Sequence, residues 1–155
     1  DYLQQLYLNN DLAEGRYRAL GETLDLSDVT VPMFVVGTET DHVAPWRSVY
    51  KVGKLVRSAD YTFCLTSGGH NAGIVSEPGH VRRSYQMQTK REGERHIDPQ
   101  TWVAETPRKD GSWWTEWAAW LAERSGEHVR PPAMGNAVAG YAALADAPGT
   151  LVHQK

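Results

Sequence analysis

The fold class of this chain can be inferred from residues 33–73, MFVVGTETDHVAPWRSVYKVGKLVRSADYTFCLTSGGHNAG. The first part of this stretch, residues 33–37, is a continuous apolar run, which is typical of a strand covered on both faces. The segment that begins at Pro45 carries apolar residues on one helical face, up to Val56. A second apolar run, rich in β-forming residues, follows at 61–66. The order strand, helix, strand predicts a right-handed βαβ unit and therefore an α/β fold.

The segments before this unit predict short helices and an extended connection. Residues 1–8 place apolar side chains at helical spacing, and residues 11–20 predict a second short helix that is weakened by Gly15. Residues 24–32 predict an extended lead-in to the first strand. The chain opens inside a helical pattern, and two strands alone do not make an independent sheet. We therefore expect residues 1–155 to be a single-domain fragment of a longer protein.

The segments after the unit predict loops, two helical stretches and a tail. Residues 74–100 are polar and irregular, which predicts surface loops. Residues 101–107 predict one helical turn, and residues 113–124 predict a tryptophan-rich helix with Ser112 as its N-cap. A stripe of tryptophans more often packs in a core than lines a binding groove, because each indole buries a large area. Residues 127–155 are rich in proline and glycine and predict an extended C-terminal tail over the surface.

Composition and charge exclude several classes of protein. The chain has 16 basic and 19 acidic residues, so it lacks the basic excess that is typical of nucleic-acid binding. No apolar run approaches the ~18 residues of a membrane span. The single cysteine excludes an internal disulfide framework and a cysteine-rich zinc site. It also favours a reducing, cytoplasmic location.

Asp41 and His70 are the strongest candidates for catalysis. Each lies in the loop directly after a predicted parallel strand, where ligands bind in open α/β sheets. An acid after one strand and a histidine after the next fit the last two members of a nucleophile–acid–histidine triad. The alternatives are a turn residue for Asp41 and a locally bonded loop residue for His70. His42 either lines the same pocket or is an exposed loop residue without a role in the site. Metal binding would need adjacent ligands at positions 41 and 42, which is an unfavourable geometry. We therefore expect neither a metal nor a cofactor.

The thiol group of Cys64 could act as a nucleophile, but its position in the sequence argues against this role. It lies inside the apolar run Phe63-Cys64-Leu65, whereas a nucleophile of this fold class occupies a sharp turn flanked by glycines. No such turn motif occurs in the sequence. We therefore expect Cys64 to be a buried structural residue.

Several segments resemble the carboxyl-terminal part of class I polyhydroxyalkanoate synthases, which polymerise 3-hydroxybutyrate. The resemblance is strongest in TETDHVAPWRSVYKVGKL (38–55) and SGGHNAG (67–73). It extends to YLNNDL (7–12), VPMFVVG (31–37), GSWWTEWAAWL (111–121) and DAPGTLV (146–152). Asn71 and the segment SEPGH (76–80) differ from the sequence that is usual in the family, and residues 81–100 diverge as well.

The resemblance implies an α/β-hydrolase fold, of which this chain would be the carboxyl-terminal portion. It also implies a Cys–His–Asp triad in which Asp41 and His70 are the acid and the histidine, and whose cysteine lies upstream of Asp1. The implied substrates are a 3-hydroxyacyl-CoA and the growing polyester, and the implied setting is a homodimer on cytoplasmic polymer granules. The fragment alone is expected to be inactive.

Two other functions remain open at this point. One is a thioesterase or polyester depolymerase of the same fold, in which water accepts the acyl group and a serine in the upstream turn would favour hydrolysis. The other is a non-catalytic module for dimerisation or granule binding, to which the tryptophan-rich helix and the tail could contribute.

Overall fold

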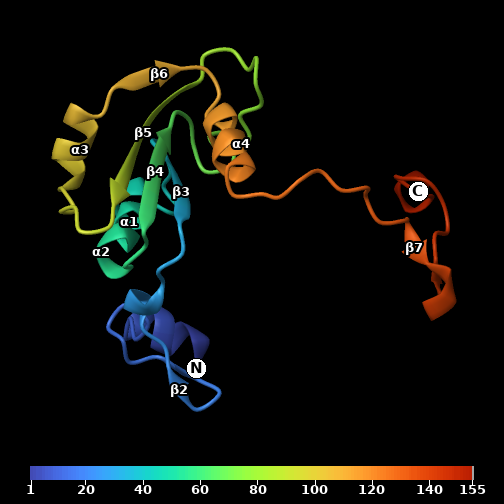
Figure 1. Cartoon of the computed structure of the whole chain (residues 1–155), viewed down its shortest axis with the longest axis horizontal. Coiled ribbons are helices and arrows are strands. Elements are labelled where there is room, and N and C mark those ends of the chain that lie inside the picture. The colour runs from blue at the N-terminus through green and yellow to red at the C-terminus, as the bar shows by residue number, and fades with distance from the viewer. Residues whose placement is uncertain (155) are drawn as a thin grey trace. The chain divides into compact units, whose positions relative to one another are not determined.

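The computed structural model describes residues 1–154. Its contacts divide the chain into two units, Asp1–Glu123 and Arg124–Lys155. The first unit contains the four-stranded sheet (Figure 1). Both hydrophobic clusters and the candidate catalytic residues also belong to this unit.

A mixed four-stranded sheet forms the centre of the first unit. Its strands lie in the order β3 (Met33–Thr38), β4 (Asp60–Thr66), β5 (Ser84–Arg91) and β6 (Arg108–Asp110). β3 and β4 are parallel, whereas the other two pairs are antiparallel. The predicted parallel pair is therefore confirmed, but the sheet has four strands where the sequence predicted two.

The connection between β3 and β4 is helical, as expected. It consists of α1 (Trp46–Tyr50) and α2 (Val52–Leu55), two short helices instead of a continuous one. Pro45 directly precedes α1, close to its predicted place at the first helical position. The connection brings the chain back so that β4 runs beside β3 in the same direction.

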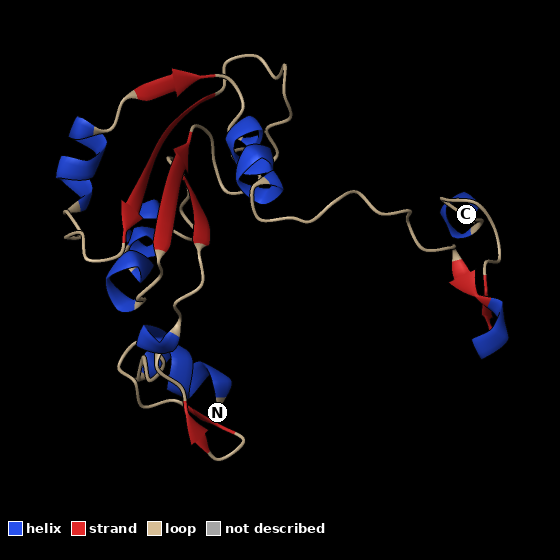
Figure 2. Cartoon of the chain, viewed as in Figure 1, coloured by secondary structure: helices blue, strands red, loops and turns tan. Residues whose placement is uncertain are grey.

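The two faces of β4 bury alternate side chains in different clusters. Tyr61, Phe63 and Leu65 pack on one face with side chains from α1, α2 and α3 (Pro99–Glu105). Cys64 packs on the other face with Trp113 and Trp114, at the start of α4 (Trp114–Ala122). The sheet is therefore covered by helices on both faces, which is an α/β arrangement (Figure 2).

The prediction of surface loops over residues 74–100 is wrong for residues 84–91, which form β5, and for the start of α3 at Pro99, but it holds for residues 74–83 and 92–98. The strand pairs with β4 along its whole length, from Asp60↔Arg91 to Thr66↔Tyr85. Gln86 is buried in it, and its Nε2 donates hydrogen bonds to the backbone oxygens of Val103 (2.8 Å) and Thr106 (2.6 Å). A polar residue that is paired in this way does not give the apolar signal of a buried strand.

The two predicted helical stretches near the end of the first unit are present. α3 is longer than the expected single turn, and Asp98 accepts hydrogen bonds from the backbone N–H groups of Gln100 and Thr101 at its start. Ser112 precedes α4, and its Oγ accepts a hydrogen bond from the Trp114 N–H at 3.0 Å. The N-cap position belongs to Trp113, so the prediction of Ser112 as the N-cap is wrong by one residue, although Ser112 accepts this hydrogen bond next to the cap.

The N-terminal segment differs in part from expectation. A π-helix covers Leu3–Leu8, but the helix predicted over residues 11–20 is absent. The backbone oxygen of Asp11 accepts hydrogen bonds from Arg16 and Tyr17, and its carboxylate pairs with Arg16 at 3.1 Å. These contacts fold the segment into turns, which lead to the hairpin of β1 (Arg18–Ala19) and β2 (Glu22–Thr23). The predicted lead-in is interrupted by a short 3-10 helix, Leu26–Asp28.

The second unit has little regular structure. It holds one short antiparallel pair, β7 (Gly135–Asn136) with β8 (Tyr141–Ala142), and the 3-10 helices Ala137–Ala139 and Leu151–His153. Large apolar side chains are exposed along it, including Met134, Val138 and Leu144. Across residues 1–154, no helix has the length and apolar character that a bilayer crossing requires.

Cys64 is a structural residue in this fold, as predicted. Its side chain is fully buried against Tyr85 and Trp113, and burial raises the pKa of the thiol to about 12. A thiol in this environment is protonated at neutral pH and inaccessible, so it is a poor nucleophile.

We expect Cys64 to react with iodoacetamide at least about a hundredfold more slowly in the native chain than in urea, because thiolate is the reactive form. Labelling rates followed by mass spectrometry measure the difference. The variant Cys64→Ala should lose only about 1 kcal/mol of stability. Equal labelling rates in the native and unfolded chains would contradict the assignment.

A second test concerns the contact between α2 and β4. A Cβ on Gly53 would lie 2.6 Å from a ring carbon of Tyr61, which is itself buried. We expect Gly53→Ala to lower the free energy of unfolding by about 1–3 kcal/mol, because overpacking outweighs the better helix propensity of alanine. Gly126→Ala is the matched control, since a Cβ there meets no atom within 4 Å. Urea denaturation of the two variants gives the comparison, and equal stability would rule out the proposed clash.

Candidate catalytic site

The candidate site lies where β3 and β4 end. Since these strands are parallel, the loops that follow them leave the sheet at the same edge. Two backbone hydrogen bonds join the loops: Glu39 N–H donates to Thr66 O at 3.0 Å, and Thr40 N–H donates to Gly68 O at 3.1 Å. The two segments that carry Asp41 and His70 are therefore held side by side.

Asp41 and His70 are in direct contact. The Oδ2 atom of Asp41 lies 2.9 Å from Nδ1 of His70. The proximity that the sequence predicted is thus confirmed. The Asp41 side chain is only 7% exposed, whereas the His70 side chain is 48% exposed, so the imidazole presents its outer part to solvent.

The backbone fixes the charge and the orientation of Asp41. Its Oδ1 accepts hydrogen bonds from the N–H groups of Val43 and Ala44, both at 2.8 Å. The bond from Ala44, followed by the bonds from His70 and Val43, lowers the pKa of Asp41 to about 2. Asp41 is therefore a carboxylate at neutral pH and can only accept hydrogen bonds.

This charge state determines the tautomer of neutral His70. Because Asp41 accepts, Nδ1 of His70 carries the hydrogen that is shared with Oδ2. Nε2 is then unprotonated and able to take a proton from a thiol or hydroxyl brought to it. The carboxylate is also placed so that it would stabilise the imidazolium formed by such a proton transfer.

Sequence reasoning missed the residues that support this pair. The hydroxyl of Thr38 donates to Asp41 Oδ2 at 3.3 Å. The indole N–H groups of Trp113 and Trp114 donate to the backbone oxygens of Gly73 (3.1 Å) and Ile74 (2.9 Å) in the loop that carries His70. The available signal was the need of a buried indole N–H for a partner, although the sequence does not say which partner it finds.

The other predicted site residue, His42, is exposed beside Asp41. Asp41 hydrogen-bonds to His70 and not to His42. A role for His42 in shaping a substrate pocket therefore stays a prediction. Within residues 1–154, no three His, Cys, Asp or Glu side chains gather in a way that could hold a metal ion.

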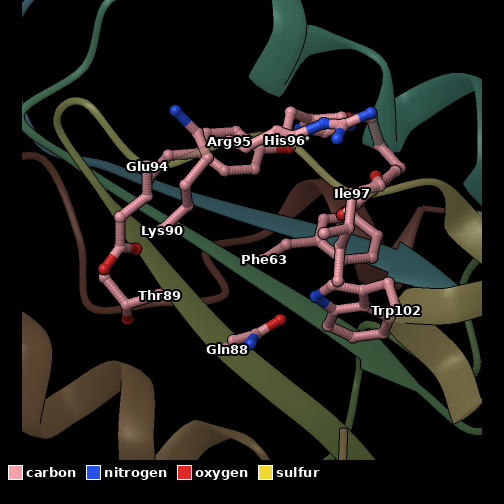
Figure 3. Close-up of a pocket in the computed structure, with 11 residues that line it drawn as sticks. Phe63, Gln88, Thr89, Lys90, Glu94, Arg95, His96, Ile97 and Trp102 are labelled. Carbon is pink, nitrogen blue, oxygen red and sulfur yellow. Dashed lines mark hydrogen bonds between the residues drawn. The ribbon is translucent and has the colours of Figure 1, made fainter. Parts of the chain in front are cut away.

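A cavity of about 80 Å³ lies elsewhere, on the face of the sheet that α1 and α3 cover (Figure 3). Phe63, Trp102 and His96 are among the residues that line it. Burial, together with Lys54 and Lys90, lowers the pKa of His96. Neither Asp41 nor His70 lines this cavity, so it is separate from the candidate catalytic pair.

Comparison with known proteins gives a consistent set of relatives. The chain is 35% identical to the poly(3-hydroxyalkanoate) polymerase subunit PhaC of Cupriavidus necator over 156 aligned residues. It is 37% identical to the poly(3-hydroxyalkanoate) polymerase of Methylorubrum extorquens and 32% identical to the PhaC subunit of Rhizobium etli. Each of these alignments covers 99% of this chain but only 25%, 24% and 23% of the respective relative. No protein-family model matches the chain.

These relatives agree with the resemblance seen in the motifs around Asp41 and His70. The chain spans about a quarter of the length of the relatives it matches, and the matched quarter is their carboxyl-terminal part. The chain is therefore similar, over nearly its whole length, to the carboxyl-terminal quarter of poly(3-hydroxyalkanoate) polymerases.

Proposed function

We propose that this chain acts as the carboxyl-terminal part of a polyhydroxyalkanoate synthase, an acyltransferase of the α/β-hydrolase fold. In this proposal, Asp41 and His70 complete a Cys–His–Asp triad whose cysteine lies in a segment upstream of Asp1. The observation that carries the proposal is the 2.9 Å contact between Asp41 and His70 at the ends of two parallel strands. The similarity to polymerases across 99% of the chain supports it.

The proposed reaction uses His70 as a general base twice. Nε2 first takes the proton of the upstream thiol, and the thiolate attacks the thioester carbon of a 3-hydroxyacyl-CoA. Coenzyme A departs and takes a proton from the imidazolium. The acyl group then remains on the protein as a thioester of the cysteine. Nε2 then takes the proton of a 3-hydroxyl group, whose oxygen attacks this thioester. An ester bond forms, and the cysteine thiolate is released and reprotonated.

Asp41 supports both proton transfers without reacting itself. It keeps the hydrogen of His70 on Nδ1 and stabilises the imidazolium. Its Oδ1 already accepts two backbone hydrogen bonds, so only Oδ2 faces the imidazole. Any further help of Asp41 in deprotonating the incoming hydroxyl would pass through this Oδ2 atom.

The setting of the reaction belongs to the same proposal. The partners would be a 3-hydroxyacyl-CoA, the growing polyester and a second copy of the polymerase, on polymer granules in the cytoplasm. Residues 1–155 would form one fragment of the catalytic domain, with residues 127–155 as its C-terminal tail. His42, which is exposed next to Asp41, would border the substrate pocket.

The first test reconstitutes the proposed enzyme from two parts. Coenzyme A release from 3-hydroxybutyryl-CoA is measured with this chain alone and with the separately expressed upstream part. We expect turnover only with both parts. His70→Ala and Asp41→Asn should each lower the rate by about 10³–10⁴-fold, because the base or its correct tautomer is lost.

The matched control is His80→Ala. His80 forms a similar pair with Glu77, in which Nδ1 lies 2.9 Å from Oε1. This pair lies in the loop between β4 and β5, away from the ends of the parallel strands β3 and β4. Its replacement should leave the rate unchanged. Turnover by this chain alone would refute the proposal that the nucleophile lies upstream of Asp1. Release of free 3-hydroxybutyrate without polymer would favour a hydrolase. Full activity of His70→Ala together with retained granule binding would favour a non-catalytic module.

A second test uses the pH dependence of stability. The folded pKa of Asp41, about 2, lies below its ordinary value of 3.8. The carboxylate therefore contributes stability that is fully present above the ordinary pKa and is lost as the pH falls towards 2. We expect the difference in unfolding free energy between the native chain and Asp41→Asn to shrink between about pH 5 and pH 2. Urea denaturation across this range measures the difference, and a constant value would show that the pKa of Asp41 is not lowered.

A further inference from the structure

The start of α4 is bonded to the loop that carries His70. The Trp113 indole N–H donates to Gly73 O at 3.1 Å, and the Trp114 indole N–H donates to Ile74 O at 2.9 Å. The Ser112 hydroxyl donates to Ser76 O in the same loop. Three consecutive side chains of one segment therefore bond to backbone oxygens at three positions of the loop.

Gly73 is the central point of this contact. Its carbonyl accepts the Trp113 N–H, and its Cα packs so tightly against Thr38 that an added Cβ would lie 2.5 Å from the Thr38 methyl carbon. Thr38 in turn donates to Asp41 Oδ2. A continuous set of contacts therefore connects Trp113 to the carboxylate that holds His70.

The loop is fixed on both sides of His70. Before it, Gly68 O accepts a hydrogen bond from Thr40 N–H at 3.1 Å. After it, Gly73 N–H donates to Gly69 O at 2.8 Å, which closes a turn around His70, and Trp113 holds the far end of that turn. His70 itself is 48% exposed, so little packing of its own ring fixes its position.

We propose that Trp113 is a positioning residue for His70, which it holds in place through its indole hydrogen bond to Gly73 O. The proposal rests on the proposed function, in which His70 is the general base. Trp113 is 4% exposed and packs against Cys64 and Tyr85 behind the loop, so it supports the site from the interior of the protein.

This arrangement predicts an effect on the reaction step and not on substrate binding. When the indole N–H is removed, the Gly73 carbonyl loses its bond to Trp113 and the end of the His70 turn is released. The imidazole then spends less time in the geometry that Oδ2 of Asp41 requires. A small displacement of a reacting group costs up to about a hundredfold in rate, whereas substrate affinity does not depend on this bond.

The test variant is Trp113→Phe, which keeps an aromatic ring in the core but removes the donor. The matched control is Trp117→Phe in α4, the helix that Trp113 precedes. Trp117 packs against Trp113 with ring centroids 5.7 Å apart, is 38% exposed, and does not bond to the His70 loop. Both variants are made in this chain, which is then combined with the upstream part of the polymerase, and kcat and KM for 3-hydroxybutyryl-CoA are measured.

We expect Trp113→Phe to lower kcat about 10- to 100-fold with KM unchanged, and Trp117→Phe to leave both constants unchanged. Urea denaturation sets the conditions under which both variants are fully folded. Equal kcat for Trp113→Phe and the native chain, or an equal loss in both variants, would overturn the proposal. A parallel rise of KM would also overturn it, because it would place Trp113 in substrate binding.

A second measurement does not depend on turnover. The chain is labelled with ¹⁵N-histidine, and the nitrogen shifts of His70 report which ring nitrogen carries the hydrogen. We expect the Nδ1–H form in the native chain and in Trp117→Phe, and a mixture of tautomers in Trp113→Phe. Unchanged His70 shifts in Trp113→Phe would overturn the positioning role. If His70→Ala keeps full turnover while these shifts change as expected, the proposed function fails and the positioning of His70 by Trp113 stands.

Discussion

Phe63 and Cys64 are neighbours in β4, yet their side chains lie in separate hydrophobic clusters on opposite faces of the sheet. This is the constraint on which the first unit depends, because β4 is also paired along both edges, with β3 and β5. A strand enclosed on four sides needs helices on both faces, and α1 to α3 and α4 supply them. The direction of β4 then determines that His70 emerges beside Asp41.

The parts of the fold that were predictable from sequence are those with an apolar signal. β3 and β4 are continuous hydrophobic runs, and the helical connection between them follows from the spacing of its apolar residues. β5 was missed because Gln86, one of its buried residues, is buried through two hydrogen bonds and not through apolar contact. The prediction of a helix over residues 11–20 was wrong for a similar reason. Polar groups decide the conformation there, because the backbone oxygen and the carboxylate of Asp11 hold the segment in a turn.

The candidate site was predictable to the same extent. Two polar residues after two parallel strands were enough to place Asp41 next to His70, since topology alone brings such loops together. The supporting groups were not predictable. Thr38 is one residue of a β-forming run, and the acceptor of the Trp113 N–H lies 40 residues away in the sequence. Such contacts depend on how the helices pack, which local patterns do not contain.

The chain offers an internal comparison for its own site. The pairs Asp41–His70 and Glu77–His80 have the same 2.9 Å separation between carboxylate oxygen and Nδ1. Their surroundings differ, because the Asp41 side chain is 7% exposed and accepts two backbone N–H groups, whereas the Glu77 side chain is 55% exposed. An exposed pair is screened by water and contributes little, while a carboxylate held by backbone donors keeps its orientation and charge. Distance alone does not distinguish the two pairs, but the environment of the carboxylate does.

The antiparallel pairing of β4 with β5 determines where residues could be inserted into the chain. No crossover helix is needed between these strands, so residues 67–83 form a single loop from one strand to its neighbour. The first half of this loop is bonded to the Asp41 loop and to α4, whereas Glu77 and His80 bond only to each other across its tip. The entropy of closing a loop grows slowly, and doubling its length costs only about 0.6 kcal/mol. We therefore expect residues 77–82 to accept an insertion, such as a tag or a cleavage site, without displacement of His70.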